Sequence, residues 1–210
     1  MPVLGCGLLA ALAAVDDGAF RFVVHEDSVL EWAEVAAYAV AACAAVAVAR
    51  RTRGIVRVAY GALVVCALAA IGEELSWGQR LFDVVTPESV AAANRQEELN
   101  VHNLAGAESK TRDALLVAAL YGGLAPLVLR PGLLVPPRRL VPAFAVAAAY
   151  IVIRLAYLPR PNYVQAKFSE WPEFCFAAAV ALAALHTLDR CRTGRSTTEA
   201  ASPAAPVNDS

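Results

Sequence analysis

The sequence predicts an all-α integral membrane protein, a bundle of about six transmembrane helices with a partly helical outer loop. Of its 210 residues, 59% are hydrophobic and only 18% are charged, and the mean hydropathy is +0.52. Such a composition is typical of membrane proteins. The apolar residues also come in long blocks, and a helix needs about 20 mostly apolar residues to cross a bilayer.

Five blocks approach or reach the length of a span, and a sixth is interrupted. The five are residues 29–49, 55–77, 114–129, 140–158 and 172–188. The sixth, residues 3–24, contains Asp16 and Asp17, so it crosses the membrane only if these two side chains lie at an interface. We expect one transmembrane domain at 1–192, with a polar outer loop at 78–113. The tail at 193–210, rich in Ser, Thr, Ala and Pro, is predicted to be disordered.

The distribution of arginine predicts the orientation, because positively charged residues in short loops remain on the cytoplasmic side. Three clusters follow the second, fourth and last predicted spans: Arg50, Arg51, Arg53 and Arg57; Arg130, Arg138 and Arg139; Arg190, Arg192 and Arg195. With six spans, all three clusters fall on one side. We therefore expect a multi-pass protein of the plasma membrane with both termini in the cytoplasm, although Arg80, Arg95 and Lys110 are exceptions on the outer side.

The segment GEELSWGQRLF, residues 72–82, places polar residues where the third span should finish. If the helix continues to about Trp77, then Glu73 and Glu74 lie within the outer membrane boundary. Ionisable residues at that depth are costly and usually functional. At helical spacing Glu73, Trp77 and Arg80 share one face. The structural alternative is that one of the glutamates pairs with Arg80 and caps the helix.

A second polar segment, NRQEELNVHN at 94–103, follows a helix start signalled by Thr86, Pro87 and Glu88. An extended chain would place five alternating side chains on one side: Asn94, Gln96, Glu98, Asn100 and His102. A helix would instead group Asn94, Glu98 and His102 on one stripe and Gln96, Asn100 and Asn103 on another. Either conformation gives a dense hydrogen-bonding surface.

Metal binding rests on one pair in this segment. Glu98 and His102 are four residues apart, a spacing found in metal-ligand pairs and also on many surface helices. We predict no cofactor, and a divalent metal at this pair is left open. On the same side, HEDSVLEWAE puts Glu31 one turn inside the second span, where a functional role is favoured. Trp32 and Trp171 are interpreted as interfacial anchors.

These motifs, in their order along the chain, resemble those of a family of prokaryotic polytopic membrane proteins. HEDSVLEW, GEELSWGQRLF, TPE and NRQEELNVHN are similar to the family's E-D-x-x-x-E-W, G-E-E-[IL]-S-W-G-Q-R and N-x-Q-x-E-x-N-x-H-N motifs. The resemblance covers roughly residues 26–104. It implies the fold and the location, and it brings no established activity.

Two families of membrane hydrolases are less similar. Intramembrane CAAX-type proteases carry E-E-x-x-x-R and later histidine motifs, whereas here Arg80 comes two residues late and those later motifs are missing. Ceramidase-like hydrolases hold zinc with several histidines, and the only candidates are His25, His102 and His186. A hydrolase or transferase of another kind, with Glu73 or Glu74 as general base and His102 or Arg80 stabilising charge, is the alternative function.

We expect a polar pocket at the outer face that binds a lipid headgroup or small polar ligand, or that makes the protein an envelope scaffold. Its predicted lining is Glu31, Glu73, Glu74, Gln79, Arg80, Asn94, Gln96, Glu98, Asn100, His102 and Asn103. The expected partner is the lipid bilayer, and no nucleic acid. An ion-coupled transporter is the least favoured alternative, because the inner halves of the spans lack polar residues. The sequence does not indicate the oligomeric state.

Overall fold

The computed structural model describes residues 1–24, 28–82, 85–88, 107–158 and 162–194. The side chains of Arg80, Leu81, Ala107 and Glu108 lie outside this description. Within the described ranges the chain forms helices and turns and contains no strand. The predicted all-α fold class is therefore confirmed.

Five helices are long and apolar enough to cross a membrane. These spans are Asp17–Arg51, Gly54–Glu74, Ser109–Val128, Arg138–Tyr157 and Tyr163–Arg192. Their main helices are α3 (Val29–Arg51), α4 (Gly54–Glu74), α7 (Ala107–Val128), α8 (Val141–Tyr157) and α10 (Glu170–Arg192). The shorter elements are α1 (Pro2–Val15), α2 (Asp17–Val24), η1 (Ser76–Gly78), α5 (Gln79–Phe82), η2 (Arg138–Leu140) and α9 (Tyr163–Lys167). By length and composition, this set of helices fits a membrane protein.

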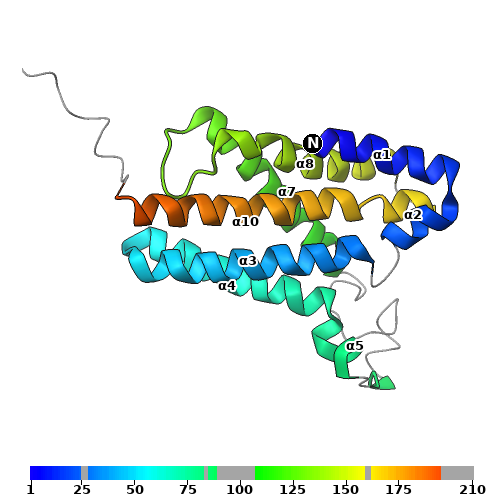
Figure 1. The fold of residues 1–210 in the computed structure, drawn as a ribbon, viewed down its shortest axis with the longest axis horizontal. Helices are drawn as coiled ribbons and strands as arrows, with labels where there is room; N and C mark the ends of the chain where they lie inside the picture. The colour runs from blue at the N-terminus through cyan, green and yellow to red at the C-terminus, as the bar shows by residue number, and fades with distance from the viewer. Residues whose placement is uncertain (25–27, 83–84, 89–106, 159–161, 195–210) are drawn as a thin grey trace, which may run out of the picture.

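The long helices form a row in which α10 is central (Figure 1). It packs against α3 on one side and α8 on the other, while α4 packs on α3 and α7 packs on α8. We call the end of the bundle where α4 and α8 finish and α3 and α10 begin the acidic end. The opposite end, where α3 and α10 finish among arginines, is the basic end. The arrangement is not flat, because α7 crosses behind α10 (Figure 1).

Small side chains allow these helices to pack closely. Ala44, Ala45 and Ala184 are buried where α3 and α10 meet, next to Tyr60 of α4. A second cluster joins α7, α8 and α10 around Ala119, Ala147, Ala148, Ala179 and two phenylalanines, Phe144 and Phe176. The rings of these phenylalanines meet edge to face, 5.7 Å between centroids. In a lipid environment such close van der Waals packing drives helix association, because lipid and apolar side chains are alike.

The N-terminal segment predicted at 3–24 is divided into two helices. Asp16 adopts an extended conformation, with φ −144° and ψ 95°, and ends α1. Its carboxylate then accepts a hydrogen bond from the Ala19 amide at 2.9 Å, at the start of α2. With 14 residues, α1 is about 21 Å long, shorter than the roughly 30 Å hydrocarbon core. The interruption at Asp16 and Asp17 thus divides the segment into a helix–break–helix unit.

Trp171, interpreted above as an interfacial anchor, holds α1 against α10. Its indole Nε1 donates to the carbonyl oxygen of Pro2 at 2.8 Å. A Cβ at Gly5 would lie only 2.0 Å from Cζ2 of the same ring, so glycine is required for this close approach. The ring of Trp171 also packs against Phe174, with centroids 5.6 Å apart. The tryptophan thus works as a helix-to-helix contact.

The outer loop predicted at 78–113 is shorter than expected, because α7 begins at Ala107. The first turns of α7 are polar and include Lys110, Arg112 and Asp113. A search for long apolar blocks therefore places the start of this span too late, at residue 114. The predicted helix start at Thr86, Pro87 and Glu88 is described only as far as Glu88, which is helical. The predicted disordered tail lies outside the described residues from 195 onward.

Candidate functional site: the acidic end of the bundle

The motif GEELSWGQRLF does not continue α4 as a helix. The helix ends at Glu74, and the next turn has φ of 45° at Ser76, 52° at Trp77 and 86° at Gly78. The prediction that the helix reaches Trp77 is therefore wrong. Left-handed backbone at a non-glycine residue costs on the order of 1–3 kcal/mol and persists only where its surroundings enforce it. Here the Ser76 side chain is fully buried.

This turn folds Trp77 back over the last turn of α4. Its indole Nε1 donates to Oε1 of Glu73 at 2.7 Å. A Cβ at Gly72 would meet the indole ring at 3.0 Å, so the glycine makes room for the ring. Glu73 and Trp77 do meet, as helical spacing predicts, but they meet because the backbone turns back at Ser76–Gly78 and not because α4 continues. Downstream, Gln79 donates from Nε2 to Oγ1 of Thr86 at 2.5 Å, which links α5 to the following segment.

Carboxylates from three helices gather at the acidic end. We call them the acidic cluster: Glu31 and Glu34 from α3, Glu74 from α4, and Glu170 and Glu173 from α10. Glu34 lies at its centre, with only 4% of its surface exposed, and the other four carboxyl groups all act on it electrostatically. Among the described residues, no lysine or arginine forms an ion pair with Glu34. A buried carboxylate beside like charges is costly unless a proton or a cation joins it.

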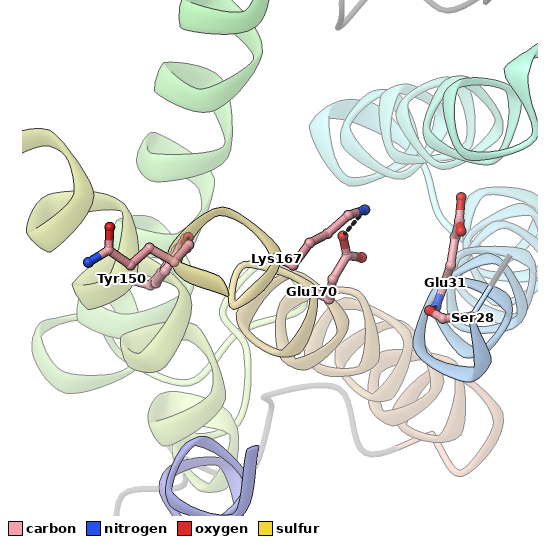
Figure 2. A network of polar contacts seen from close by, with 6 residues as sticks. Ser28, Glu31, Tyr150, Lys167 and Glu170 are labelled. Atoms are coloured by element: carbon pink, nitrogen blue, oxygen red, sulfur yellow. Dashed lines mark hydrogen bonds and ion pairs between the residues drawn. The ribbon is translucent and has the colours of Figure 1, made fainter. Parts of the chain in front are cut away.

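Figure 2 shows two members of this cluster, Glu31 and Glu170, with some of their polar neighbours. Lys167 pairs with Glu170 at 3.1 Å, and both side chains are largely shielded from solvent. Figure 2 shows this pair with Tyr150 on one side and Glu31 on the other. Tyr150 donates to the carbonyl oxygen of Gln165 at 2.9 Å and also lies within electrostatic reach of Glu173. On α3, the Tyr38 hydroxyl lies against the Glu34 carboxyl group, one turn further into the bundle.

Helix starts position three of these carboxylates. Ser28 is the N-cap of α3, and its Oγ accepts from the Glu31 amide at 3.3 Å. Glu170 is the first residue of α10 and Glu173 lies in its first turn. Acidic side chains are favoured there, because the positive end of the helix dipole and unpaired amides point toward them. The helix starts therefore tolerate Glu31, Glu170 and Glu173. Glu74 instead ends α4, where the helix dipole disfavours a carboxylate, and Glu34 lies one turn deeper in α3 than Glu31.

Of the predicted pocket residues, the structure brings Glu31 and Glu74 into the acidic cluster and directs Glu73 to Trp77. The remaining polar segment lies outside the described residues: Asn94, Gln96, Glu98, Asn100, His102 and Asn103. The side chain of Arg80 is also outside this description. The metal pair Glu98 and His102, and a catalytic role for His102, thus stay predictions. Within the described ranges, no group of three or more His, Cys, Asp or Glu side chains could hold a metal ion.

Sequence reasoning did not select Glu34 and Tyr38 and treated Glu170 and Glu173 as interfacial charge. A signal for them was present in HEDSVLEWAEVAAY. Glu31, Glu34 and Tyr38 follow each other at i, i+3 and i+7, one helix face. Glu34 is also one turn deeper in its helix than Glu31, and carboxylates become rarer and more often functional with depth in the membrane.

The fold and this site together fit a membrane protein with charged groups gathered at one end of its helices. Comparison with known proteins adds no narrower class: no family model, no curated protein and no solved structure matches the chain. The resemblance of its motifs to a family of prokaryotic membrane proteins therefore stays a prediction.

Proposed function

We propose that the protein is a multi-pass protein of the plasma membrane whose acidic cluster binds the polar headgroup of a membrane lipid. The observation that supports this most is the burial of Glu34 among four other carboxyl groups. Folding places Glu34 among like charges where hydration is lost, with the Tyr38 hydroxyl against its carboxyl group. A positively charged or hydrogen-bond-donating group from a ligand would relieve that cost.

The proposed orientation places the acidic end outside and the basic end, where α10 finishes, in the cytoplasm. An N-terminus in the cytoplasm would need residues 3–24 to cross as a sixth span, whereas Pro2 lies against Trp171 in the first turn of α10, at the acidic end. Arginines at the basic end support the proposed orientation, because positive residues are retained on the cytoplasmic side. Two of them also hold the link between α7 and α8. Arg190 donates to the carbonyl oxygen of Gly132 at 3.1 Å, and Arg138 donates to that of Pro126 at 2.9 Å.

Lipid retention by purified protein tests the headgroup proposal. We expect Glu34→Gln to reduce the fraction of protein that carries a co-purified lipid in native mass spectrometry by about tenfold, the effect of losing roughly 1.4 kcal/mol. Glutamine has nearly the same shape and can still accept a hydrogen bond from Tyr38, so the variant should fold. Asp113→Asn on α7 is the control, because its side chain is 65% exposed and is absent from the interactions of Glu34.

Equal lipid retention by the wild type, Glu34→Gln and Asp113→Asn would contradict the proposal. A melting temperature of Glu34→Gln far below that of the control would show instead that Glu34 serves the fold, because its loss then acts on the helices themselves. An unchanged melting temperature with reduced lipid retention is the result we expect.

A further inference from the structure

An apolar groove runs between α4 and α7. It has a volume of about 640 Å³, within the roughly 300–1,000 Å³ range of ligand sites. One wall is α4, with Ala62 and Cys66, and the other is α7, with Ala114 and Ala118. All four of these small side chains are exposed. The groove is thus an open channel along the bundle, and its walls carry little side-chain bulk.

The floor of the groove is built from the central helices. Phe176, Val180 and Ala183 of α10 line it, and Tyr38 of α3 contributes its ring. On α4 the lining runs from position 59 to position 70, about 16 Å at 1.5 Å per residue. That length is close to half of the roughly 30 Å hydrocarbon core, the depth of one lipid leaflet.

One end of this groove opens onto the acidic cluster. Tyr38 lines the groove, and its hydroxyl lies against the carboxyl group of Glu34. Ala70 lines it one helical turn before Glu74. Phe176 lines it one turn after Glu173. An amphiphile with its apolar part in the groove would therefore place its polar end among these carboxylates.

We propose that the groove holds one acyl chain of a phospholipid whose headgroup ammonium lies at the acidic cluster. This inference rests on the proposed function and names the class of lipid. The groove lining is apolar apart from Tyr38, Tyr60, Thr111 and Tyr121, which suits a hydrocarbon chain.

The charges at the acidic end favour an ammonium headgroup over an anionic one. Five carboxyl groups gather there, alongside Arg154 in the last turn of α8, which interacts with Tyr150. An ammonium group forms charge-assisted hydrogen bonds with carboxylates. Lys167 brings a positive charge to the same end through its pair with Glu170, which suits the phosphate of the same lipid. A headgroup without a cation, such as phosphatidylglycerol, would add negative charge beside the cluster and is disfavoured.

Native mass spectrometry with two lipids of identical chains tests this inference. The probes are palmitoyl-oleoyl phosphatidylethanolamine and palmitoyl-oleoyl phosphatidylglycerol, added at equal concentration to the full-length protein in detergent micelles. We expect one phosphatidylethanolamine per protein, at about tenfold or greater preference over phosphatidylglycerol. Ala118→Trp, which fills the groove, should lower that binding by about tenfold or more. The neighbouring Val117→Trp is the matched control, because Val117 is 68% exposed and lies outside the groove lining.

The outcomes distinguish a failure of the groove inference from a failure of the proposed function. If Ala118→Trp binds phosphatidylethanolamine as the wild type does while Glu34→Gln does not, the groove inference is overturned and the proposed function stands. If Glu34→Gln leaves binding and lipid preference unchanged, the proposed function fails. A protein that prefers phosphatidylglycerol overturns the choice of lipid. A dimer mass that Ala118→Trp abolishes would show that a second copy of the chain occupies the groove, which also overturns the inference.

A second pair of variants decides the matter if Ala118→Trp does not fold. Ala62→Trp fills the groove from the opposite wall, on α4, and Val65→Trp is its control, with 67% of that valine exposed outside the lining. The groove inference predicts the same loss for Ala62→Trp and no loss for Val65→Trp. Equal binding by these two variants overturns it.

Discussion

Two adjacent glycines in α7 have opposite expected responses to the same substitution. A Cβ at Gly122 would lie 2.5 Å from Cγ and Cδ1 of Phe144, on the helix that α7 packs against. A Cβ at Gly123 would lie 3.9 Å from Cβ of the same phenylalanine, an ordinary contact distance. Because the ring of Phe144 also packs edge to face on Phe176, it cannot move away without disturbing α10. We expect Gly122→Ala to destabilise the bundle and Gly123→Ala not to.

The difference between the two variants isolates the steric conflict. Both replacements gain about 0.8–1.0 kcal/mol of helix propensity, because glycine is the poorer helix former. Only Gly122→Ala forces an extra carbon into a filled core, which typically costs about 1–3 kcal/mol. Gly122→Ala should therefore be less stable than Gly123→Ala by about 1–3 kcal/mol. For a domain of this size, each kcal/mol corresponds to about 2–4 °C in melting temperature.

Thermal unfolding of both variants in one detergent measures this difference directly. A melting temperature for Gly122→Ala equal to or above that of Gly123→Ala would refute the packing of α7 on α8 through Phe144. The groove between α4 and α7 would then also need revision, because both Gly122 and Phe144 line it.

Three further substitutions test other contacts. The Tyr60 hydroxyl lies 2.8 Å from Oγ1 of Thr187, so Tyr60→Phe should lose about 1–3 kcal/mol of unfolding free energy, and a double-mutant cycle with Thr187→Val should show coupling. Gly78→Ala places a side chain at φ 86° and should cost about 1–2 kcal/mol in thermal unfolding. Glu73→Gln can still accept from the Trp77 indole and should change stability by less than about 0.5 kcal/mol. Trp77→Phe removes that donor and should lose about 0.5–1.5 kcal/mol of unfolding free energy. If Glu73→Gln loses as much stability as Trp77→Phe, the charge of Glu73 contributes to stability.

The long helices could be predicted from the sequence, because a long apolar segment in a membrane has few alternatives to a helical conformation. Each of the five long helices lies on one of the five predicted spans, although α4 ends at Glu74, short of residue 77. Their ends are harder to predict, since hydropathy does not register polar helical turns such as those before residue 114 in α7. Asp16 and Asp17 marked the break in the N-terminal segment, but only the structure shows that Asp16 ends one helix and caps the next.

The candidate site was only partly visible in the sequence. The i, i+4 spacing of Glu73 and Trp77 predicts their contact, but it does not distinguish a continuing helix from a turn that reverses at Ser76. Glu34 was overlooked because its partners come from helices far apart in the chain, Glu74 on α4 and Glu173 on α10. Such a gathering depends on how helices pack, which periodicity within one helix does not reveal.

The central claim is that a lipid ammonium group lies at Glu34. Solid-state NMR of the protein with ¹³C-labelled glutamate carboxyl groups, reconstituted in ¹⁵N-ethanolamine phosphatidylethanolamine, measures this contact through carbon–nitrogen dipolar dephasing. We predict that part of the glutamate carboxyl signal is dephased in the wild type and in Asp113→Asn, and that this dephasing is lost in Glu34→Gln. Dephasing that is absent from the wild type, or that is unchanged in Glu34→Gln, would contradict the account.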